Sequence, residues 1–122
     1  MRLNPDCIRD ILLKLEEITD GKVVYDFDAK NATKLSNKCP VNEILYHLNI
    51  CIENNFIKGR TNGNCYYVQD ITLIGHTFLS DIRSDKNWNK VKVIANNIGS
   101  FSLDTLKEIA VGVITSQIKN LL

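Results

Sequence analysis

Four cysteines and two histidines are the side chains of this 122-residue chain best suited to metal binding or nucleophilic chemistry. A structural zinc site normally takes its ligands from two closely spaced pairs, and the chain has no Cys-x-x-Cys. No secretory signal is apparent, and reducing compartments disfavour disulfides. The spacing therefore predicts free thiols without bound metal at Cys7, Cys39, Cys51 and Cys65.

The histidines and one carboxylate pair could also do chemistry. His47 follows Tyr46 in an uncharged stretch, which is compatible with a catalytic base or a metal ligand. A partly buried histidine bonded to the backbone is the interpretation that we favour. His76 is predicted to be structural, with Gly75 allowing close packing against the neighbouring hairpin. Asp26 and Asp28 share one face of a predicted strand, where a cation site competes with an ordinary solvated strand end.

Sequence motifs for catalysis are missing. The chain has no Gly-rich phosphate loop, no His-Glu-x-x-His and no Gly-x-Ser-x-Gly. We therefore expect a binding module without a cofactor rather than an enzyme.

A helix is predicted from Pro40 to Asn55. Proline suits the first helical turn, and Asn54-Asn55 suits a left-handed stop. Apolar residues recur at spacings of three and four, as a buried stripe requires; they are Ile44, Leu45, Leu48, Ile52 and Phe56. The other face is mainly polar and carries Asn42, Glu43, Tyr46, His47, Asn49, Glu53 and Asn54.

A strand, a turn and a second strand should follow this helix. Lys58 to Asn64 contains two glycines and no apolar side chain, which is typical of a tight connection, and Cys65 to Val68 supplies the returning strand. Thr72 can cap a further helix. Its inner side is predicted to carry Leu73, Phe78, Leu79 and Ile82. Helix, two-stranded wing and helix in this order predict an α+β fold of the winged helix-turn-helix type.

The N-terminal part supplies a helix and a strand. Asn4-Pro5-Asp6 is a helix start, apolar spacing continues to Ile18, and Asp20-Gly21 follows the helix end. Lys22 to Phe27 is predicted as a strand that pairs with the wing. Asp28 to Cys39 is polar, with only Ala32 and Leu35 to anchor it, so it forms either a one-to-two-turn helix or an irregular loop.

Two more helices complete the chain. The first has an apolar stripe and closes at Asn96-Asn97 and Gly99, and the second begins at Ser102. The stripe of the first is formed by Trp88, Val91, Ala95 and Ile98. One face of the second carries Leu106, Ile109, Ala110 and Val113, and another carries Val111, Ile114, Ile118 and Leu121. Two apolar faces need two partners, so the second face favours a homodimer over burial within the same domain.

The length fits one domain over residues 1–122, with a winged-helix core at about 4–84 and a helical extension at about 86–122. Hydrophobic residues make up 44% of the chain, enough for a single core. No run approaches the ~20 apolar residues of a membrane span. We expect a cytoplasmic protein without a membrane partner.

Charge is distributed unevenly along the chain. Residues 1–28 carry four basic and seven acidic side chains, whereas residues 29–65 carry five basic and two acidic ones. The helix-turn-helix region is thus the positive part of the molecule, as expected for a surface that approaches phosphate. Scattered cations of this number also occur on ordinary solvated faces.

Two partner classes fit this pattern. In the first, double-stranded DNA is bound by groove-facing and phosphate-binding side chains. The groove-facing set is Asn42, Tyr46, His47 and Asn49, and the phosphate-binding set is Lys34, Lys38, Lys58 and Arg60. Against DNA, the helix carries Glu43 and Glu53 and no arginine, although arginine makes the commonest specific base contact. In the second class, the module engages a host protein or itself without nucleic acid.

Three segments carry a family resemblance. They are Ile71 to Lys90, with Gly75-His76-Thr77-Phe78-Leu79 and Trp88 as its most specific part, Tyr46-His47-Leu48, and Asn55-Phe56-Ile57. Together they resemble a family of small bacterial and prophage proteins, the domain of unknown function family 2513. The likeness extends from the first helix to about Ile109. It implies a winged-helix-like fold and a bacteriophage association, and it implies no particular activity.

Overall fold

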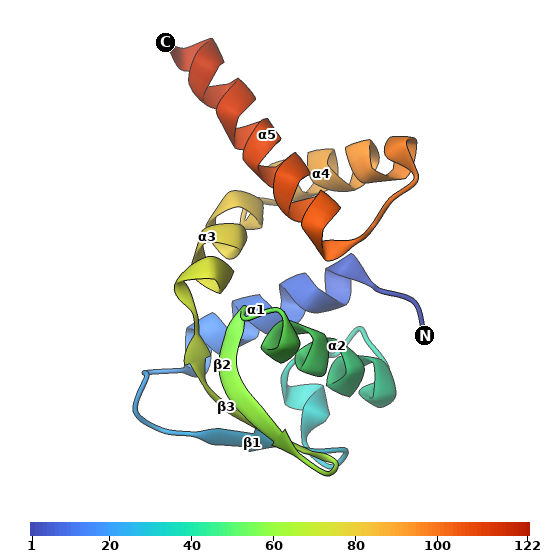
Figure 1. Ribbon diagram of the computed structural model, residues 1–122, viewed down its shortest axis with the longest axis vertical. Coiled ribbons are helices and arrows are strands. Elements are labelled where there is room, and N and C mark those ends of the chain that lie inside the picture. Colours follow the sequence, from blue (N-terminus) through green and yellow to red (C-terminus); the bar gives the residue numbers. More distant parts are fainter. The chain divides into compact units, whose positions relative to one another are not determined.

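The computed structural model describes every residue from Met1 to Leu122 and shows an α+β chain (Figure 1). Its elements are α1 (Pro5–Ile18), β1 (Tyr25–Phe27), the 3-10 turn η1 (Ala32–Lys34), α2 (Val41–Glu53), β2 (Ile57–Asn62), β3 (Cys65–Ile71), α3 (Leu73–Ile82), α4 (Asp85–Ile98) and α5 (Leu103–Leu121). The predicted fold class is confirmed, and the element order is compatible with a winged helix. The chain divides into two compact units, Met1–His76 and Thr77–Leu122, whose boundary falls within α3.

Helix α1 begins and ends where the sequence predicts. The Asn4 side chain accepts hydrogen bonds from the backbone N–H groups of Asp6 at 3.1 Å and Cys7 at 3.4 Å, so it caps the first turn. At the other end, the N–H of Thr19 donates to the carbonyl of Leu15 at 2.9 Å. The inner face is fully apolar, with Cys7, Ile8, Ile11, Leu12 and Leu15 buried.

The sheet is antiparallel, with strand order β1-β3-β2. Strand β1 does pair with the hairpin, but it starts at Tyr25 rather than at the predicted Lys22. The reason is a local turn, in which the Asp20 carboxylate accepts the N–H groups of Lys22 and Val23 at 2.9 and 3.0 Å. The bonds from Val23 and Lys22 also hold the pKa of Asp20 below its usual value.

The β2–β3 hairpin closes through the two residues Gly63 and Asn64. Gly63 has a φ of 62°, a left-handed conformation that glycine adopts without steric cost. Along the ladder Arg60 lies opposite Tyr67, and a bulge interrupts the register between Lys58 and Gly59. The hairpin therefore matches the predicted strand, turn and strand.

The segment before α2 contains little regular structure. Its only helical element is the 3-10 turn η1, followed by irregular chain to Pro40. Ala32 and Leu35 are buried, as expected of the two anchoring residues. Of the two forms that the sequence allowed, the structure has a single turn within an irregular loop.

Helix α2 stops at a left-handed residue, as predicted. Asn55 has a φ of 60°, and the N–H of Phe56 reaches back to the Cys51 carbonyl at 2.9 Å. The buried stripe differs from the prediction, because it runs through Ile44, His47, Leu48 and Cys51. Leu45 and Ile52 are only half-buried.

Helix α3 is capped by Thr72, whose hydroxyl oxygen accepts the Gly75 N–H at 3.1 Å. Phe78, Leu79 and Ile82 are buried, which confirms three of the four predicted inner residues. Leu73 is 81% exposed, so the prediction for it was wrong. It lies five positions before Phe78, roughly 140° around the helix.

The second unit pairs α4 with α5. Ser84 and Ser102 cap the two helices, and Gly99 ends α4 with a φ of 84°. The buried residues of the two helices are apolar, namely Trp88, Val91 and Ala95 on α4 and Leu103, Leu106, Ala110 and Val113 on α5. Ile98 was predicted to be among them but is exposed, and Ile109 is half-buried. The Gln117 amide donates to the Asn87 side chain at 2.6 Å.

Candidate functional site

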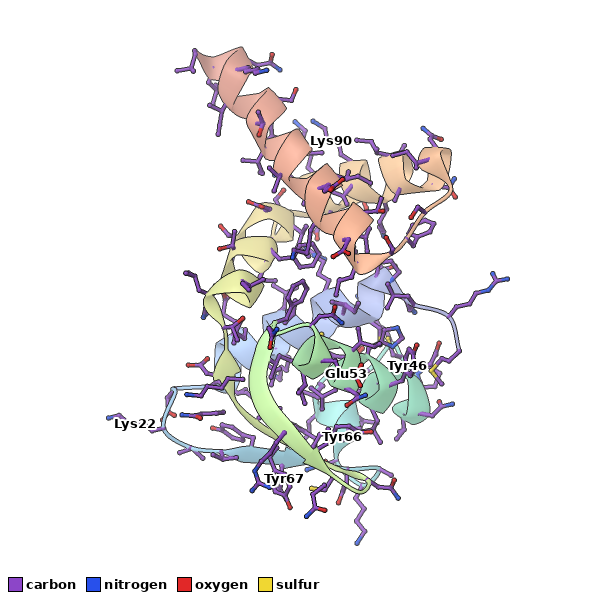
Figure 2. The ribbon with its side chains drawn as sticks, viewed as in Figure 1. Lys22, Tyr46, Glu53, Tyr66, Tyr67 and Lys90 are labelled. Atoms are coloured by element: carbon purple, nitrogen blue, oxygen red, sulfur yellow. The ribbon has the colours of Figure 1, made fainter.

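The outer face of α2 presents the polar side chains that the sequence assigned to it. Asn42 and Tyr46 are exposed, and Asn49 is half-buried. Figure 2 shows Tyr46 and Glu53 on this helix. The Asn49 amide donates to the Glu53 carboxylate at 2.9 Å, so part of its hydrogen-bonding capacity is already used within the helix. This face offers amide and phenol groups together with the carboxylates of Glu43 and Glu53.

His47 is not part of that face, and its predicted contact with a DNA groove was wrong. The side chain is fully buried because it lies three residues after Ile44, on the same stripe. Its Nε2 accepts the backbone N–H of Asn4 at 2.7 Å, which leaves Nδ1 to donate to the Glu43 carbonyl at 2.6 Å. The favoured interpretation is confirmed in the bonds to the backbone, but the ring is fully rather than partly buried.

Two cations stand on β2. Lys58 and Arg60 are exposed and lie within the strand. The Arg60 guanidinium lies over the Tyr67 ring, 4.4 Å from its centre, in a cation–π contact. These three residues share a shallow hollow of about 210 Å³ with Val24 and Gln69. The outer surface of the sheet thus forms a patch that combines these cations and the Tyr67 ring with the exposed Asp26 carboxylate, which lies opposite Tyr67.

Tyr67 and Gln69 are residues of this patch that sequence reasoning missed. Successive residues of a strand point to opposite faces, and Figure 2 shows Tyr66 and Tyr67 on different sides of the sheet. A hydrogen bond with Cys65 raises the pKa of the Tyr67 phenol above its usual value. The sequence signal for this patch was a spacing of two residues, which places Lys58 with Arg60 on one face of a strand and Tyr67 with Gln69 on one face of the next.

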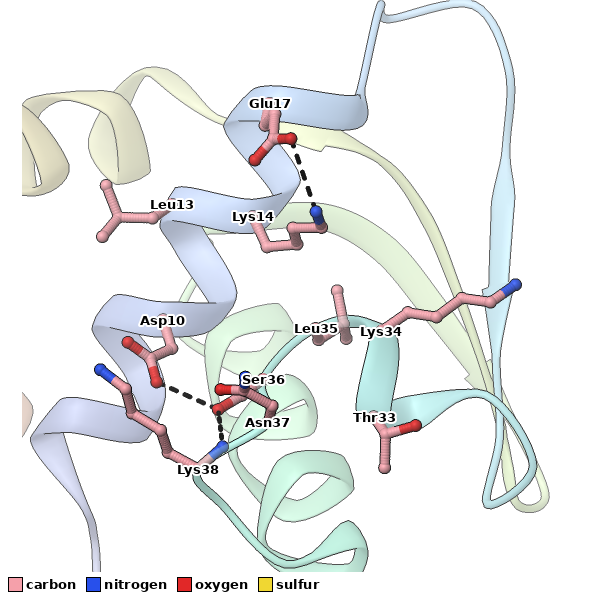
Figure 3. A pocket seen from close by; sticks show the side chains of 10 residues that line it. All are labelled: Asp10, Leu13, Lys14, Glu17, Thr33, Lys34, Leu35, Ser36, Asn37 and Lys38. Carbon is pink, nitrogen blue, oxygen red and sulfur yellow. Dashed lines mark hydrogen bonds and ion pairs between the residues drawn. The ribbon is translucent and has the colours of Figure 1, made fainter.

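Lys34 and Lys38 line a different hollow, of about 410 Å³, between α1 and residues 33–38 (Figure 3). Figure 3 shows the two side chains extending in different directions. Carboxylates of α1 also line this hollow, and Asp10 accepts a hydrogen bond from the Ser36 hydroxyl at 3.0 Å. The structure therefore does not gather the four predicted phosphate-binding cations into one patch.

The remaining candidates form no cluster. His76 is exposed rather than packed, whereas Gly75 is buried in close contact with the carbonyl of Phe56, as its predicted role requires. Asp26 is exposed and Asp28 half-buried. No group of three or more histidine, cysteine or acidic side chains is placed to hold a metal ion.

The cysteines divide into two buried and two half-buried thiols. Burial raises the pKa of Cys51 to about 12, and burial together with a hydrogen bond to Cys39 raises the pKa of Cys7. Because the thiolate is the reactive species, these two should react slowly with a disulfide reagent. Cys39 and Cys65 are accessible enough to react first.

We therefore expect two thiols of the native protein to react quickly with Ellman's reagent at mildly alkaline pH, and all four to react after denaturation without reductant. Cys39→Ser and Cys65→Ser should each remove one fast-reacting thiol, while Cys51→Ser should remove none. Fewer than four thiols in the denatured protein would contradict the free-thiol prediction. Four fast thiols in the native protein would contradict the assignment by burial.

No helix of the chain combines the length and apolar character that crossing a membrane requires. Residues 2–102, which include α2, the hairpin and α4, match the family model described as hypothetical protein DUF2513. Comparison with curated proteins and with solved structures finds no match. The family match covers more than half of the sequence, and the chain therefore belongs to the DUF2513 family, a domain of unknown function.

Proposed function

We propose that the chain is a winged-helix binding module, of phage or prophage type, that engages double-stranded DNA through α2 and β2. The observation that carries the proposal is the direct succession of a helix with an exposed polar face and an antiparallel hairpin with two exposed cations. In helix-turn-helix proteins the recognition helix lies in the major groove, and cations on the adjoining hairpin would contact the phosphate backbone.

The polar face of α2 supports base recognition by amides. Asparagine can bond in a bidentate manner to adenine, and Asn42 is exposed near the helix start, where recognition helices contact base edges. Tyr46 lies one turn later on the same side. The helix has no arginine, so guanine recognition by it is not part of the proposal.

The β2 cations support phosphate binding. Lys58 and Arg60 alternate along an outer strand, and the Tyr67 ring supports the guanidinium at 4.4 Å. Phosphate contacts of this kind position a protein on DNA and supply affinity that depends on salt. Lys34 and Lys38, which stand beside carboxylates, contribute less in this proposal.

The test is duplex binding by the double variant Lys58→Ala/Arg60→Ala. Each lost phosphate contact lowers the slope of log affinity against log salt by roughly 0.9, so the expected decrease is about 1.8. Fluorescence anisotropy of a labelled duplex, titrated at several salt concentrations, measures it.

The matched control is Lys90→Ala/Lys119→Ala, which removes the same charge from α4 and α5. This control should retain the wild-type salt slope. Absence of salt-dependent binding by the wild-type protein at low ionic strength would overturn the DNA proposal, and an equal loss in the control would overturn the assignment to β2.

A protein ligand is the second candidate, favoured by the carboxylates interspersed with the polar groups. Glu53 bonds to Asn49 on α2, and Asp26 lies opposite Tyr67 in the sheet. Such mixed charge weakens attraction to phosphate. It is compatible with a protein–protein interface, in which tyrosine is enriched. In lysate from phage-infected cells, a partner that resists nuclease and is lost with Tyr46→Ala would support this candidate over DNA.

A further inference from the structure

Helix α5 carries a second apolar stripe that α4 does not cover. Val111 is 54% exposed, Ile118 is 51% exposed and Leu121 is 88% exposed, while Ile114 is half-buried. These four residues, here called the exposed stripe, lie beside the face that packs on α4. Figure 1 shows the C-terminal end of α5 extending beyond α4.

The spacing of the apolar residues in the exposed stripe indicates that its partner is another helix. Its residues are separated by three, four and three positions, the alternation of the first and fourth positions of a heptad repeat. Val111 and Ile118 take the first position, where β-branched residues pack well. Ile114 and Leu121 take the fourth. Such a pattern packs against a second helix that bears the same pattern.

The residues that flank the exposed stripe point to an identical partner. In a heptad pair the flanking positions set partner choice through charge. Here the flanking positions are uncharged, namely Ala110, Thr115, Gln117 and Leu122. A second copy therefore brings the matching pattern and meets no like charge at these positions.

We propose that the exposed stripe of α5 pairs with the same stripe of a second copy, with the two helices antiparallel. A two-fold axis between Ile114 and Ile118 then places Val111 against Leu121 of the other copy, and each Ile114 against the other Ile118. A parallel pair would instead bring Lys107, one turn before Val111, next to its own copy. This self-association does not depend on DNA binding.

The size of the contact sets the expected affinity. Two heptads of paired helix bury on the order of 1,000 Å² over both copies, at the lower limit for specific interfaces. We therefore expect a reversible monomer–dimer equilibrium whose dimer fraction rises with protein concentration. Sedimentation velocity over about 10 to 500 µM covers the range in which an interface of this size associates.

Ile118→Glu tests the contact, because a side chain already half exposed tolerates a charge without loss of the fold. Its dimer dissociation constant should rise by about tenfold or more, since a carboxylate at a heptad core position is desolvated on pairing. The control Val93→Glu, at a position that is 60% exposed on α4, should dimerise like the wild type. Circular dichroism verifies that both variants fold.

A mixture of two variants tests the antiparallel arrangement. Val111→Glu and Leu121→Lys should each dimerise poorly alone and associate when mixed, because only antiparallel pairing joins the new carboxylate to the new ammonium. A wild-type monomer at the highest concentration, or an Ile118→Glu variant that dimerises like the control, would overturn the proposal. Mixed variants that stay monomeric would overturn the antiparallel pairing.

Discussion

Replacing Gly75 with alanine is expected to lower the free energy of unfolding by about 1 to 3 kcal/mol, the range for overpacking of a tight site. A Cβ at this position would overlap the carbonyl oxygen of Phe56 and stand 2.7 Å from Cγ2 of Ile71. The Phe56 carbonyl is backbone, so a change of rotamer cannot relieve that contact. The intrinsic helix preference of alanine, worth about 1 kcal/mol over glycine, is too small to compensate.

Urea denaturation followed by circular dichroism measures this loss. Gly112→Ala is the matched control, because it lies inside α5 and a Cβ added there would meet nothing within 4 Å. At that position only helix preference acts, and the variant should be more stable by up to about 1 kcal/mol. Wild-type stability of Gly75→Ala would show that the Phe56 and Ile71 contacts relax at no cost.

Replacing His47 with alanine is expected to lower the free energy of unfolding by about 3 to 5 kcal/mol, through a cavity and a lost hydrogen bond. The imidazole is fully buried, and its Nε2 accepts the N–H of Asn4 at 2.7 Å. It thereby joins α2 to the residue that caps α1. His47→Leu, which nearly fills the space, should lose only about 1 to 3 kcal/mol, the cost of leaving the Asn4 N–H unpaired.

Denaturant titrations of both variants separate the two contributions. Asn42→Ala, an exposed change on the same helix, is the control and should alter stability by less than about 0.5 kcal/mol. If His47→Leu were as stable as the wild type, the bond to Asn4 would contribute nothing to stability. The histidine would then act only as a space-filling group.

Helix boundaries were predictable because they depend on neighbours in the sequence. The caps at Asn4, Thr72 and Ser102 and the left-handed stop at Asn55 all use residues within about one turn of the helix end. The early residues of the predicted first strand were lost for an equally local reason, since Asp20 forms a competing turn.

The buried surface of α2 was less predictable. The sequence favoured a backbone-bonded histidine at position 47 but could not identify its partner, the N–H of Asn4, which lies 43 residues earlier. The inner stripe therefore shifted from Leu45 and Ile52 toward His47 and Cys51. A partner so distant in sequence leaves no periodic signal.

The candidate site was predicted in part. The sequence identified α2, the hairpin and the cations Lys58 and Arg60, but charge along the chain does not show which cations share a surface. Lys34 faces a hollow that includes carboxylates of α1. The Arg60–Tyr67 contact depends on strand register, which follows from the two-residue loop rather than from composition.

The strand order leaves β2 as an open edge of the sheet, and an open edge affects how readily the protein aggregates. Unpaired strand edges recruit strands from other molecules unless charges or bulges obstruct them. Strand β2 has both, in Lys58, Arg60 and the irregular register at Gly59, and the other edge, β1, is only three residues long. Lys58 and Arg60 thus obstruct pairing of β2 with strands of other molecules. Neutralising both removes that protection, so the double alanine variant should scatter more light on gentle heating than a variant with the same charge loss on α4 and α5.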